Sequence, residues 1–274
     1  MAATQVHQPD CIACGTATRE IAVGPSYFDE CRACGLSRLR GYNGRSDYWD
    51  AKQARDPYWT DARRRYFRAA LRRFPGGRML DVGGGIGEFT RLALEMGFDA
   101  YSLDSSDGAT GAAARTLGGR ALAAAPEAGS FDVVTLWCVI AHVSDPCSLL
   151  QSARSWLRPG GMLWLTTPNF AFQKRYGKIL ASAGRPIDFA AEDHIWHFTQ
   201  QSLTLLFARA GFAPPRFHYV GGTDRCTALA NGSTIATQNV LIWGKRAWNR
   251  TAARANKIRV GIPTSELQVV THRH

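Results

Sequence analysis

The sequence has no long apolar run and no leader-like start. A helix that crosses a membrane needs at least about 18 consecutive apolar residues, and no stretch of this chain reaches that length. The opening residues, MAATQVHQPD, have neither the basic start nor the apolar core of a secretory signal. These absences predict a cytoplasmic protein without a transmembrane segment.

Lysine is also scarce, because 28 of the 33 basic residues are arginine. Residues 1–75 hold 13 basic and 8 acidic side chains (+5), residues 76–170 hold 6 and 9 (−3), and residues 171–274 hold 14 and 5 (+9). Positive charge on both flanks of a mildly acidic centre favours an anionic substrate or partner. A general compositional preference for arginine explains the same numbers equally well, so both interpretations stay open.

Disulfide bonds are not expected either, because thiols in the cytosol stay reduced. Four of the seven cysteines instead form two C-x-x-C pairs, Cys11 with Cys14 and Cys31 with Cys34, separated by 16 residues. This spacing is typical of tetrahedral zinc with four thiolate ligands, a closed site whose role is structural. Residues 1–45 are poor in apolar runs and need such a staple, so they form a predicted zinc-binding module.

The remainder of the chain has the pattern of an α/β protein. Residues 46–75 are predicted to be a helical connector, and residues 76–274 to be one domain in which short strands alternate with helices. This alternation implies a doubly wound, Rossmann-like parallel sheet with helices on both faces. The predicted strands are Arg78–Val82, Ala100–Asp104, Phe131–Cys138, Met162–Thr167, Arg216–Val220 and Leu267–Thr271, and the helices are Glu88–Met96, Pro146–Leu157 (closed by a Pro-Gly-Gly break) and Gln201–Ala210.

The turn after the first predicted strand of this domain carries a strong chemical signal. Leu80–Gly87 (LDVGGGIG) places an acid, Asp81, inside the strand and then a glycine-rich turn that opens a helix. Glycines let the backbone approach a ligand closely, and a helix N-terminus offers unpaired N–H groups. Asp104 ends the next strand, where a doubly wound fold places the carboxylate that binds the ribose hydroxyls of a nucleotide.

The pattern LDVGGGIGEFT resembles motif I of class I S-adenosylmethionine-dependent methyltransferases. The segments SFDVVTLWCVIAHVSDP, LRPGGMLWLTTPN and HFTQQSLTLLFARAGF resemble later segments of the same family, so the resemblance covers about residues 76–220. It implies S-adenosylmethionine as the cofactor, with Asp81 orienting the methionine amino group. It also implies that Gly83, Gly85 and Gly87 shape the loop beneath the cofactor.

The predicted adenine subsite departs from the family pattern. The segment ALAAAPEAG is short and lacks the acid that often contacts the adenine amino group in this family. We therefore expect backbone N–H groups near Ala123 to contact the adenine. Trp137, in the strand that follows, is a further candidate for contact with the cofactor.

Three histidines lie where this fold binds substrates. His142 follows the Phe131–Cys138 strand at the carboxyl edge of the sheet, and His194 and His197 lie in the segment AEDHIWHF. Methyl transfer to a hydroxyl needs a base whose pKa is near neutral, which makes His142 and His194 the candidates for catalysis or substrate contact. His197 is expected to pack beside its aromatic neighbour, and packing is the alternative for all three. Family members often have a glutamate before the first histidine, where this chain has Ala141.

The segments around this site are predicted to cover the substrate. Residues 168–198 and 221–264 are expected to be substrate-side or lid elements. Glu192 and Asp193 are expected to form a solvated turn, or alternatively to orient a histidine or contact sugar hydroxyls. Residues 233–257 have a basic amphipathic pattern, for which a lid is favoured over a surface for membranes or polyanions.

The C-x-x-C-G pairs ahead of a methyltransferase domain resemble bacterial families that act on deoxysugars, polysaccharides and secondary metabolites. The resulting prediction is O-methylation of a hydroxyl on a small-molecule or glycan substrate, including acceptors on an anionic carrier. An RNA methyltransferase is the enzymatic alternative, disfavoured by the absence of an N-P-P-[FY] motif. A catalytically degenerate scaffold is the non-enzymatic alternative, disfavoured by the intact Asp81 and Asp104.

Overall fold

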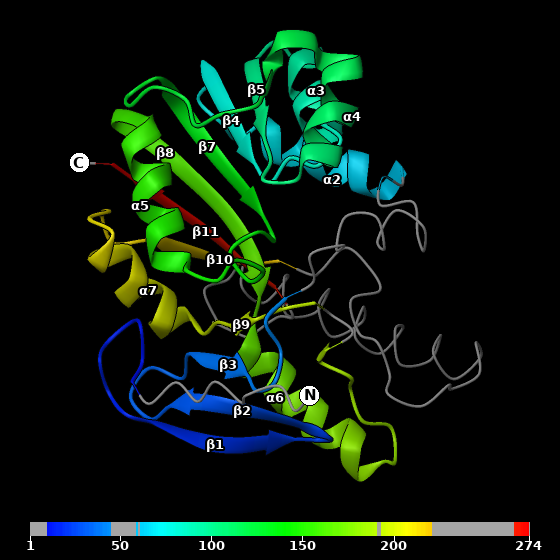
Figure 1. The fold of residues 1–274 in the computed structure, drawn as a ribbon, viewed down its shortest axis with the longest axis vertical. Helices are drawn as coiled ribbons and strands as arrows, with labels where there is room; N and C mark the ends of the chain where they lie inside the picture. Colours follow the sequence, from blue (N-terminus) through cyan, green and yellow to red (C-terminus); the bar gives the residue numbers. More distant parts are fainter. Residues whose placement is uncertain (1–9, 45–58, 60, 191–192, 221–265, 274) are drawn as a thin grey trace.

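The computed structural model describes residues 10–44, 59, 61–190, 193–220 and 266–273. Figure 1 shows a large twisted sheet flanked by helices, with a smaller sheet of mainly N-terminal residues beneath it. The predicted lid segment 221–264, with its basic helix, and most of the first half of the connector lie outside the described residues. Among the described helices, none is long and apolar enough to cross a membrane.

The large sheet contains seven strands, in the order β10-β11-β8-β7-β4-β5-β6. In chain order they are β4 (Arg78–Val82), β5 (Asp99–Leu103), β6 (Ala121–Leu122), β7 (Phe131–Trp137), β8 (Leu157–Pro168), β10 (Arg216–Val220) and β11 (Glu266–His272). The neighbours from β8 to β6 are parallel. The carboxyl ends of β4, β5 and β7 therefore meet at one edge, where the predicted cofactor residues lie.

The strand β11 corrects the expectation of a wholly parallel sheet. It is antiparallel to both of its neighbours, β10 and β8, so it runs against the other strands. Side chains alternate between the two faces in either strand direction, so the apolar pattern of a strand does not reveal which way it runs. The rest of the predicted α/β Rossmann-like architecture is confirmed.

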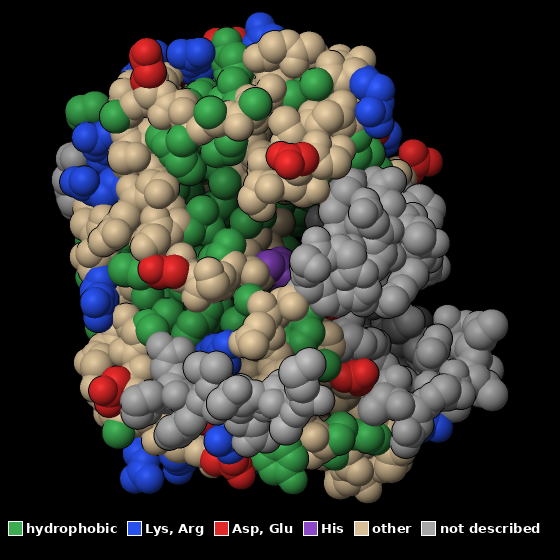
Figure 2. Space-filling view, in the orientation of Figure 1, with side chains coloured by type: hydrophobic (Ala, Val, Ile, Leu, Met, Phe, Trp, Pro, Cys, Tyr) green, Lys and Arg blue, Asp and Glu red, His purple; other side chains and the backbone are tan. Residues whose placement is uncertain are grey.

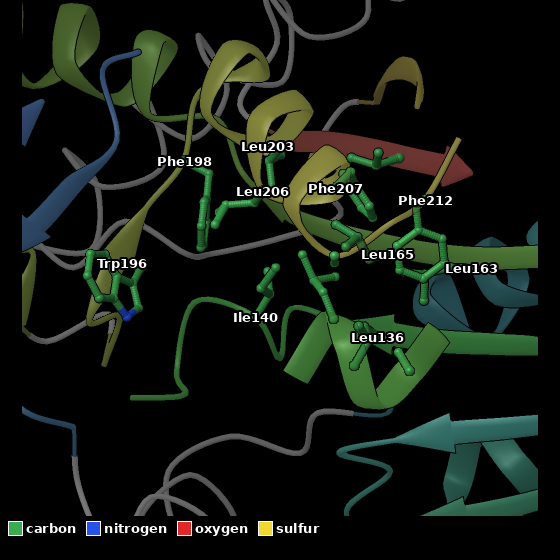
Figure 3. Close-up of a cluster of buried hydrophobic side chains, with 14 of the residues drawn as sticks. Leu136, Ile140, Leu163, Leu165, Trp196, Phe198, Leu203, Leu206, Phe207 and Phe212 are labelled. Atoms are coloured by element: carbon green, nitrogen blue, oxygen red, sulfur yellow. The ribbon is translucent and has the colours of Figure 1, made fainter. Parts of the chain in front are cut away.

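Helices cover both faces of the large sheet. They are α2 (Asp61–Leu71), α3 (Glu88–Glu95), α4 (Asp107–Leu117), α5 (Pro146–Trp156) and α7 (Gln200–Arg209), with a 3-10 turn at Gly118–Arg120. The helix α6 (Phe170–Ser182) packs against the small sheet instead. Along β4, Leu80 faces a core shared with α5 and α7, whereas Met79 faces a core shared with α2 and α3. Figure 3 shows the first core, where Leu203 and Phe207 of α7 pack over Leu165 of β8.

The boundary between α5 and β8 also differs from the prediction. The helix ends at Trp156, and the Pro-Gly-Gly stretch at residues 159–161 belongs to the strand rather than to a break before it. Gly160 donates a hydrogen bond to the carbonyl of Arg273 (2.8 Å), and Arg273 donates to the carbonyl of Gly161 (2.9 Å). A distant segment thus satisfies the backbone of these glycines, which local sequence does not reveal.

The smaller sheet joins the N-terminal residues to the insertion after β8. Its strands β1 (Thr18–Val23), β2 (Ser26–Cys31), β3 (Ser37–Leu39) and β9 (Trp196–His197) are antiparallel in that order. The strand β9 belongs to the insertion. The sheet of the N-terminal module is therefore completed by a strand that lies far along the chain.

Polar contacts reinforce this junction. Lys174 of α6 forms an ion pair with Glu30 of β2 (2.5 Å), whose side chain is buried. The Thr199 hydroxyl, which caps α7, donates a hydrogen bond to the carbonyl of Cys34 (2.6 Å). The module is thus bonded to helices at both ends of the insertion.

His197 lies in the apolar core between the module and α6. Its ring centroid is 5.0 Å from that of Phe28, 4.9 Å from Phe170 and 5.5 Å from Phe189. The ring is buried, and neither nitrogen meets a hydrogen-bond partner among the described residues. Burial lowers the pKa of His197 well below its ordinary value, and the backbone of His194 offsets this cost of burying a charge only in small part. His197 therefore packs as a neutral side chain.

We expect His197→Phe to stabilise the protein, because it replaces a buried ring with unpaired nitrogens, each costing about 1–3 kcal/mol, by an apolar ring. The folded pKa lies below the unfolded one, so the unfolded wild-type chain takes up the proton first as pH falls below about 6.5. The melting temperature of wild type should therefore fall between pH 7 and pH 5 more than that of the variant. Circular dichroism measures this difference, and the opposite order would show that His197 is bonded or charged in the folded chain.

Candidate active site and metal centre

The glycine-rich loop after β4 has a backbone that only glycine adopts easily. Gly83, Gly85 and Gly87 have φ angles of 69°, 57° and 81°. A Cβ at Gly83 would lie 2.4 Å from Val139 Cγ2, because the loop runs against the segment that follows β7. The positive φ angles therefore favour glycine at all three predicted positions, and at Gly83 the neighbouring Val139 also excludes a side chain.

Asp104 lies beside this loop. Its Oδ2 accepts a hydrogen bond from the Gly85 N–H (2.9 Å), and its Oδ1 accepts one from the Ser106 N–H (2.9 Å). A carboxylate has about four acceptor positions, so both oxygens can still accept a ribose hydroxyl. The geometry fits the predicted ribose contact, whose role stays a prediction.

Asp81 is buried in the centre of the sheet. Its carboxylate accepts hydrogen bonds from the Thr135 hydroxyl (2.9 Å) and the Thr90 hydroxyl (3.5 Å). Burial raises the pKa of Asp81 to about 7, because these two hydroxyls do not offset the cost of burying a charge. A cationic group that reached this carboxylate would restore its charge, as expected for the amino group of the methionine moiety.

The two remaining cofactor candidates differ in their surroundings. Trp137 packs edge-on against Phe67 and Phe89, with ring centroids 4.8 and 5.0 Å away. Its indole N–H meets no acceptor among the described residues. Ala123 is exposed and directly follows β6, at the same edge of the sheet as Asp104. Both positions are compatible with a cofactor at this edge, and their roles stay predictions.

The four paired cysteines form a compact sulfur cluster. Their sulfur atoms all lie within 4.8 Å of one another, with Cys11 Sγ 3.6 Å from Cys34 Sγ and Cys14 Sγ 3.4 Å from Cys31 Sγ. A tetrahedral zinc ion with Zn–S bonds of about 2.3 Å needs sulfur separations of about 3.8 Å. The cluster therefore fits a closed Cys₄ zinc site.

The two turns that carry the cysteines are alike. The Ala13 N–H points at Cys11 Sγ and the Cys34 N–H points at Cys31 Sγ, each at 3.4 Å. Gly15 and Gly35, which follow the second cysteine of each pair, have φ angles of 71° and 70°. These N–H groups stabilise thiolates, which are the form that binds zinc.

His142 and His194 are brought together by the fold. Their ring centroids are 4.7 Å apart. His142 is half-buried beyond the end of β7, and His194 is buried in the insertion. The carbonyl of Ala141 accepts backbone hydrogen bonds from Ile195 (2.8 Å) and Trp196 (3.1 Å), which fixes the insertion against the end of β7. Family members often have a glutamate at this position. Here Ala141 makes its contacts through the backbone carbonyl instead.

Asp193, for which a solvated turn was the preferred expectation and orientation of a histidine the alternative, contacts His142. His142 Nδ1 lies 2.6 Å from the carbonyl oxygen of Asp193, and the Tyr42 hydroxyl lies 2.8 Å from Asp193 Oδ1. Glu192 lies outside the described residues. Tyr42 belongs to no recognisable sequence motif. Its place in the site follows only from the packing of the module against the insertion, which the sequence does not reveal.

A separate cavity of about 510 Å³ lies between the module and α5. Its lining includes Ile12 and Arg38 of the module and Trp196, Cys147 and Arg209 of the domain. It contains none of the glycine-loop residues or the two candidate histidines. It is therefore not the predicted cofactor site.

Comparison with known proteins decides the family. Residues 53–214, more than half of the chain, match the family described as "Methyltransferase domain". The chain belongs to this methyltransferase family. The prediction of an S-adenosylmethionine-dependent methyltransferase is confirmed at the level of family and fold.

Related sequences agree with this assignment. A ubiquinone biosynthesis O-methyltransferase of Xanthomonas campestris is 31% identical over 135 residues, covering 44% of this chain and 56% of that protein. The enzyme of the same name from Parvibaculum lavamentivorans is 37% identical over 112 residues, covering 36% and 44%. The methyltransferase chain thus spans about half the length of these relatives.

Solved structures share the fold. An S-adenosylmethionine-dependent methyltransferase from Thermotoga maritima matches with a TM-score of 0.51 at 15% identity, covering 83% of this chain and 98% of that one. One from Mesorhizobium loti matches with a TM-score of 0.50 at 20% identity, covering 77% and 98%. At these identities the likeness shows the fold alone.

We expect about one zinc ion per chain, lost in the double variant Cys11→Ser with Cys34→Ser. Because the module cannot build a core without this staple, the variant should also have a lower melting temperature. Elemental analysis and thermal unfolding measure the two effects. Cys147→Ser, outside the cluster, is the matched control and should keep its zinc. Zinc retained by the double variant would contradict the assignment.

We expect Asp81→Asn to raise stability and weaken cofactor binding at the same time. The folded pKa of about 7 lies above the unfolded value near 3.9, so wild type loses stability as pH rises between these values, by up to about 4 kcal/mol at pH 8. The cofactor-free variant should therefore melt above wild type at pH 8, and the difference should shrink toward pH 5. Calorimetry should show weaker S-adenosylmethionine binding, and wild-type affinity would place the amino group elsewhere.

Proposed function

We propose that this methyltransferase transfers a methyl group to a hydroxyl of a sugar or natural product. The observation that carries the proposal is the pair His142 and His194, whose ring centroids are 4.7 Å apart. The His142 N–H donates a hydrogen bond to the carbonyl of Val139 (2.9 Å), in the segment that runs against the glycine loop. Val139, three residues before His142, contacts this loop at Gly83. A base at this point is adjacent to the predicted cofactor site, and the relatives named O-methyltransferases support an oxygen acceptor.

The residues at the predicted cofactor edge would bind and orient S-adenosylmethionine. Asp104 would hold the ribose, Asp81 would hold the amino group, and the backbone after Gly83 would support the rest of the cofactor. When bound, S-adenosylmethionine supplies an activated methyl group that forms a bond to the acceptor oxygen as its carbon–sulfur bond breaks. The main contribution of the protein is then alignment of the acceptor with that methyl group.

His142 is the preferred base. The carbonyl of Asp193 only accepts hydrogen bonds, so His142 Nδ1 carries a proton when it bonds to that oxygen. Nε2 is then the nitrogen with a lone pair, which takes the proton of the hydroxyl. His194, 4.7 Å away, is the alternative base or a contact for the acceptor.

The acceptor is proposed to be a small molecule or a glycan, with an anionic carrier supported by the positive charge of both flanks. Figure 2 shows apolar side chains down the centre of one face, with Lys and Arg placed around its rim rather than in one stripe. The carbonyl of Cys34, in the second cysteine turn, accepts a hydrogen bond from the Thr199 hydroxyl of the same chain, so this turn packs against its own protein. Neither observation favours RNA as the substrate.

We expect His142→Ala to lower turnover by about 10²–10⁴-fold while S-adenosylmethionine affinity survives, because a hydroxyl is a poor nucleophile until its proton leaves. His194→Ala should reduce turnover less if His142 is the base. The assay uses nucleotide-linked sugars, sugar phosphates, neutral glycosides and phenols as acceptors, with methylation followed by mass spectrometry. His272→Ala, an exposed histidine on β11, is the control. Near-normal turnover in both site variants would remove the acid–base role.

A further inference from the structure

Asp193 has an unusual backbone conformation beside the proposed base. Among the described residues, Asp193 (φ 58°) and Cys138 (φ 59°) are the two non-glycine residues with positive φ. The left-handed region is disfavoured for residues with a Cβ, and Asp and Asn tolerate it best. Such conformations persist where the surrounding structure holds them, and they gather at functional sites. In this conformation the carbonyl oxygen of Asp193 lies 2.6 Å from His142 Nδ1.

Tyr42 holds the side chain of the same residue. Its hydroxyl donates a hydrogen bond to Asp193 Oδ1 (2.8 Å). Tyr42 is half-buried and packs against the apolar cores on both sides of the junction. The residue thus combines an apolar anchor with a polar tip, which places the hydroxyl with little freedom.

The chain around Tyr42 runs beside the base itself. The Leu39 N–H donates a hydrogen bond to the carbonyl of Ile195 (3.0 Å). A Cβ on Gly44 would lie 3.1 Å from Ile195 Cδ1 and 3.9 Å from the carbonyl oxygen of His142. The end of the metal module therefore lies against both segments that carry the candidate histidines.

We propose that Tyr42 and Asp193 are positioning residues through which the cysteine module sets the tautomer and orientation of His142. The Tyr42 hydroxyl fixes Asp193, and the Asp193 carbonyl accepts a hydrogen bond from the Nδ1–H of His142, which leaves Nε2 as the basic nitrogen. A neutral histidine side chain in water favours the tautomer with its proton on Nε2. This arrangement favours the other tautomer, with the proton on Nδ1. The inference rests on the proposed function insofar as His142 is the base.

A purely structural role for Tyr42 predicts different behaviour. In that case loss of the hydroxyl would lower the melting temperature and weaken all activities together, without a change at the imidazole. A positioning role predicts a change in the tautomer of His142 and in kcat, with the melting temperature and the KM for S-adenosylmethionine retained. The two roles are therefore separated by spectroscopy of His142.

The test uses the full-length, zinc-loaded chain labelled with ¹⁵N-histidine, with His142 assigned by comparison with His142→Gln. Tyr42→Phe keeps the ring and removes only the hydroxyl. We expect the ratio of the Nδ1–H to the Nε2–H tautomer of His142 to fall about fivefold, the equivalent of one neutral hydrogen bond, and kcat on the best acceptor of the panel above to fall by a similar factor. Tyr27→Phe, an exposed tyrosine of the same module, is the matched control and should change neither.

A second pair of variants tests Asp193. Asp193→Asn tolerates the left-handed conformation and keeps an oxygen that accepts from Tyr42, whereas Asp193→Ala does neither well. We expect the tautomer ratio and kcat to fall further in Asp193→Ala than in Asp193→Asn. Equal losses in the two variants would contradict the role of this side chain.

The possible failures are distinct. If the His142 spectrum and kcat both stay unchanged in Tyr42→Phe, the positioning role is overturned. A loss of activity that accompanies a lower melting temperature, with no change in the His142 tautomer, would overturn it as well. If His142→Ala keeps its turnover while Tyr42→Phe still shifts the tautomer, the proposed base is wrong and the positioning contact stands.

Discussion

The antiparallel pairing of β3 with β9 connects parts of the chain that the sequence separates widely. Ser37 lies opposite His197 in this pairing, and the neighbouring residues Ile195 and Trp196 donate hydrogen bonds to the carbonyl of Ala141 beyond β7. The two short strands therefore hold the metal module, the insertion and the carboxyl edge of the large sheet in one hydrogen-bonded array. A zinc ion held by the cysteine cluster would stabilise this array, since the module is too small to bury a core of its own.

Two carboxylates at the predicted cofactor edge have different hydrogen-bond donors around them. Asp104 accepts hydrogen bonds from two backbone N–H groups, those of Gly85 and Ser106. Asp81 has only the hydroxyls of Thr135 and Thr90, and its charge is costly until a cation approaches. Asp81 is thus suited to a positive group, which agrees with its predicted contact to the amino group of the cofactor, and the contact of Asp104 with the ribose hydroxyls stays a prediction.

Local patterns predicted much of this arrangement, and pairings between distant segments account for what they missed. The loop LDVGGGIG and the two C-x-x-C turns were predictable because their chemistry depends on residues close together in sequence. The direction of β11 and the existence of β9 depend on which strands meet, which periodicity does not encode. The contact between Tyr42 and Asp193 was not predictable for the same reason, since 151 residues separate them.

The completion of the small sheet by β9 has a consequence for synthesis of the chain. The strand β3 pairs with residues that are translated 160 positions later, as Ser37 and His197 show. At the usual pace of translation this interval lasts roughly 10 to 30 s, during which the outer edge of β3 has no native partner. An unpaired edge is open to association with other chains, and its short length, three residues, limits that risk. Early capture of zinc by the nascent cysteine turns would hold the first three strands in register until the fourth emerges from the ribosome.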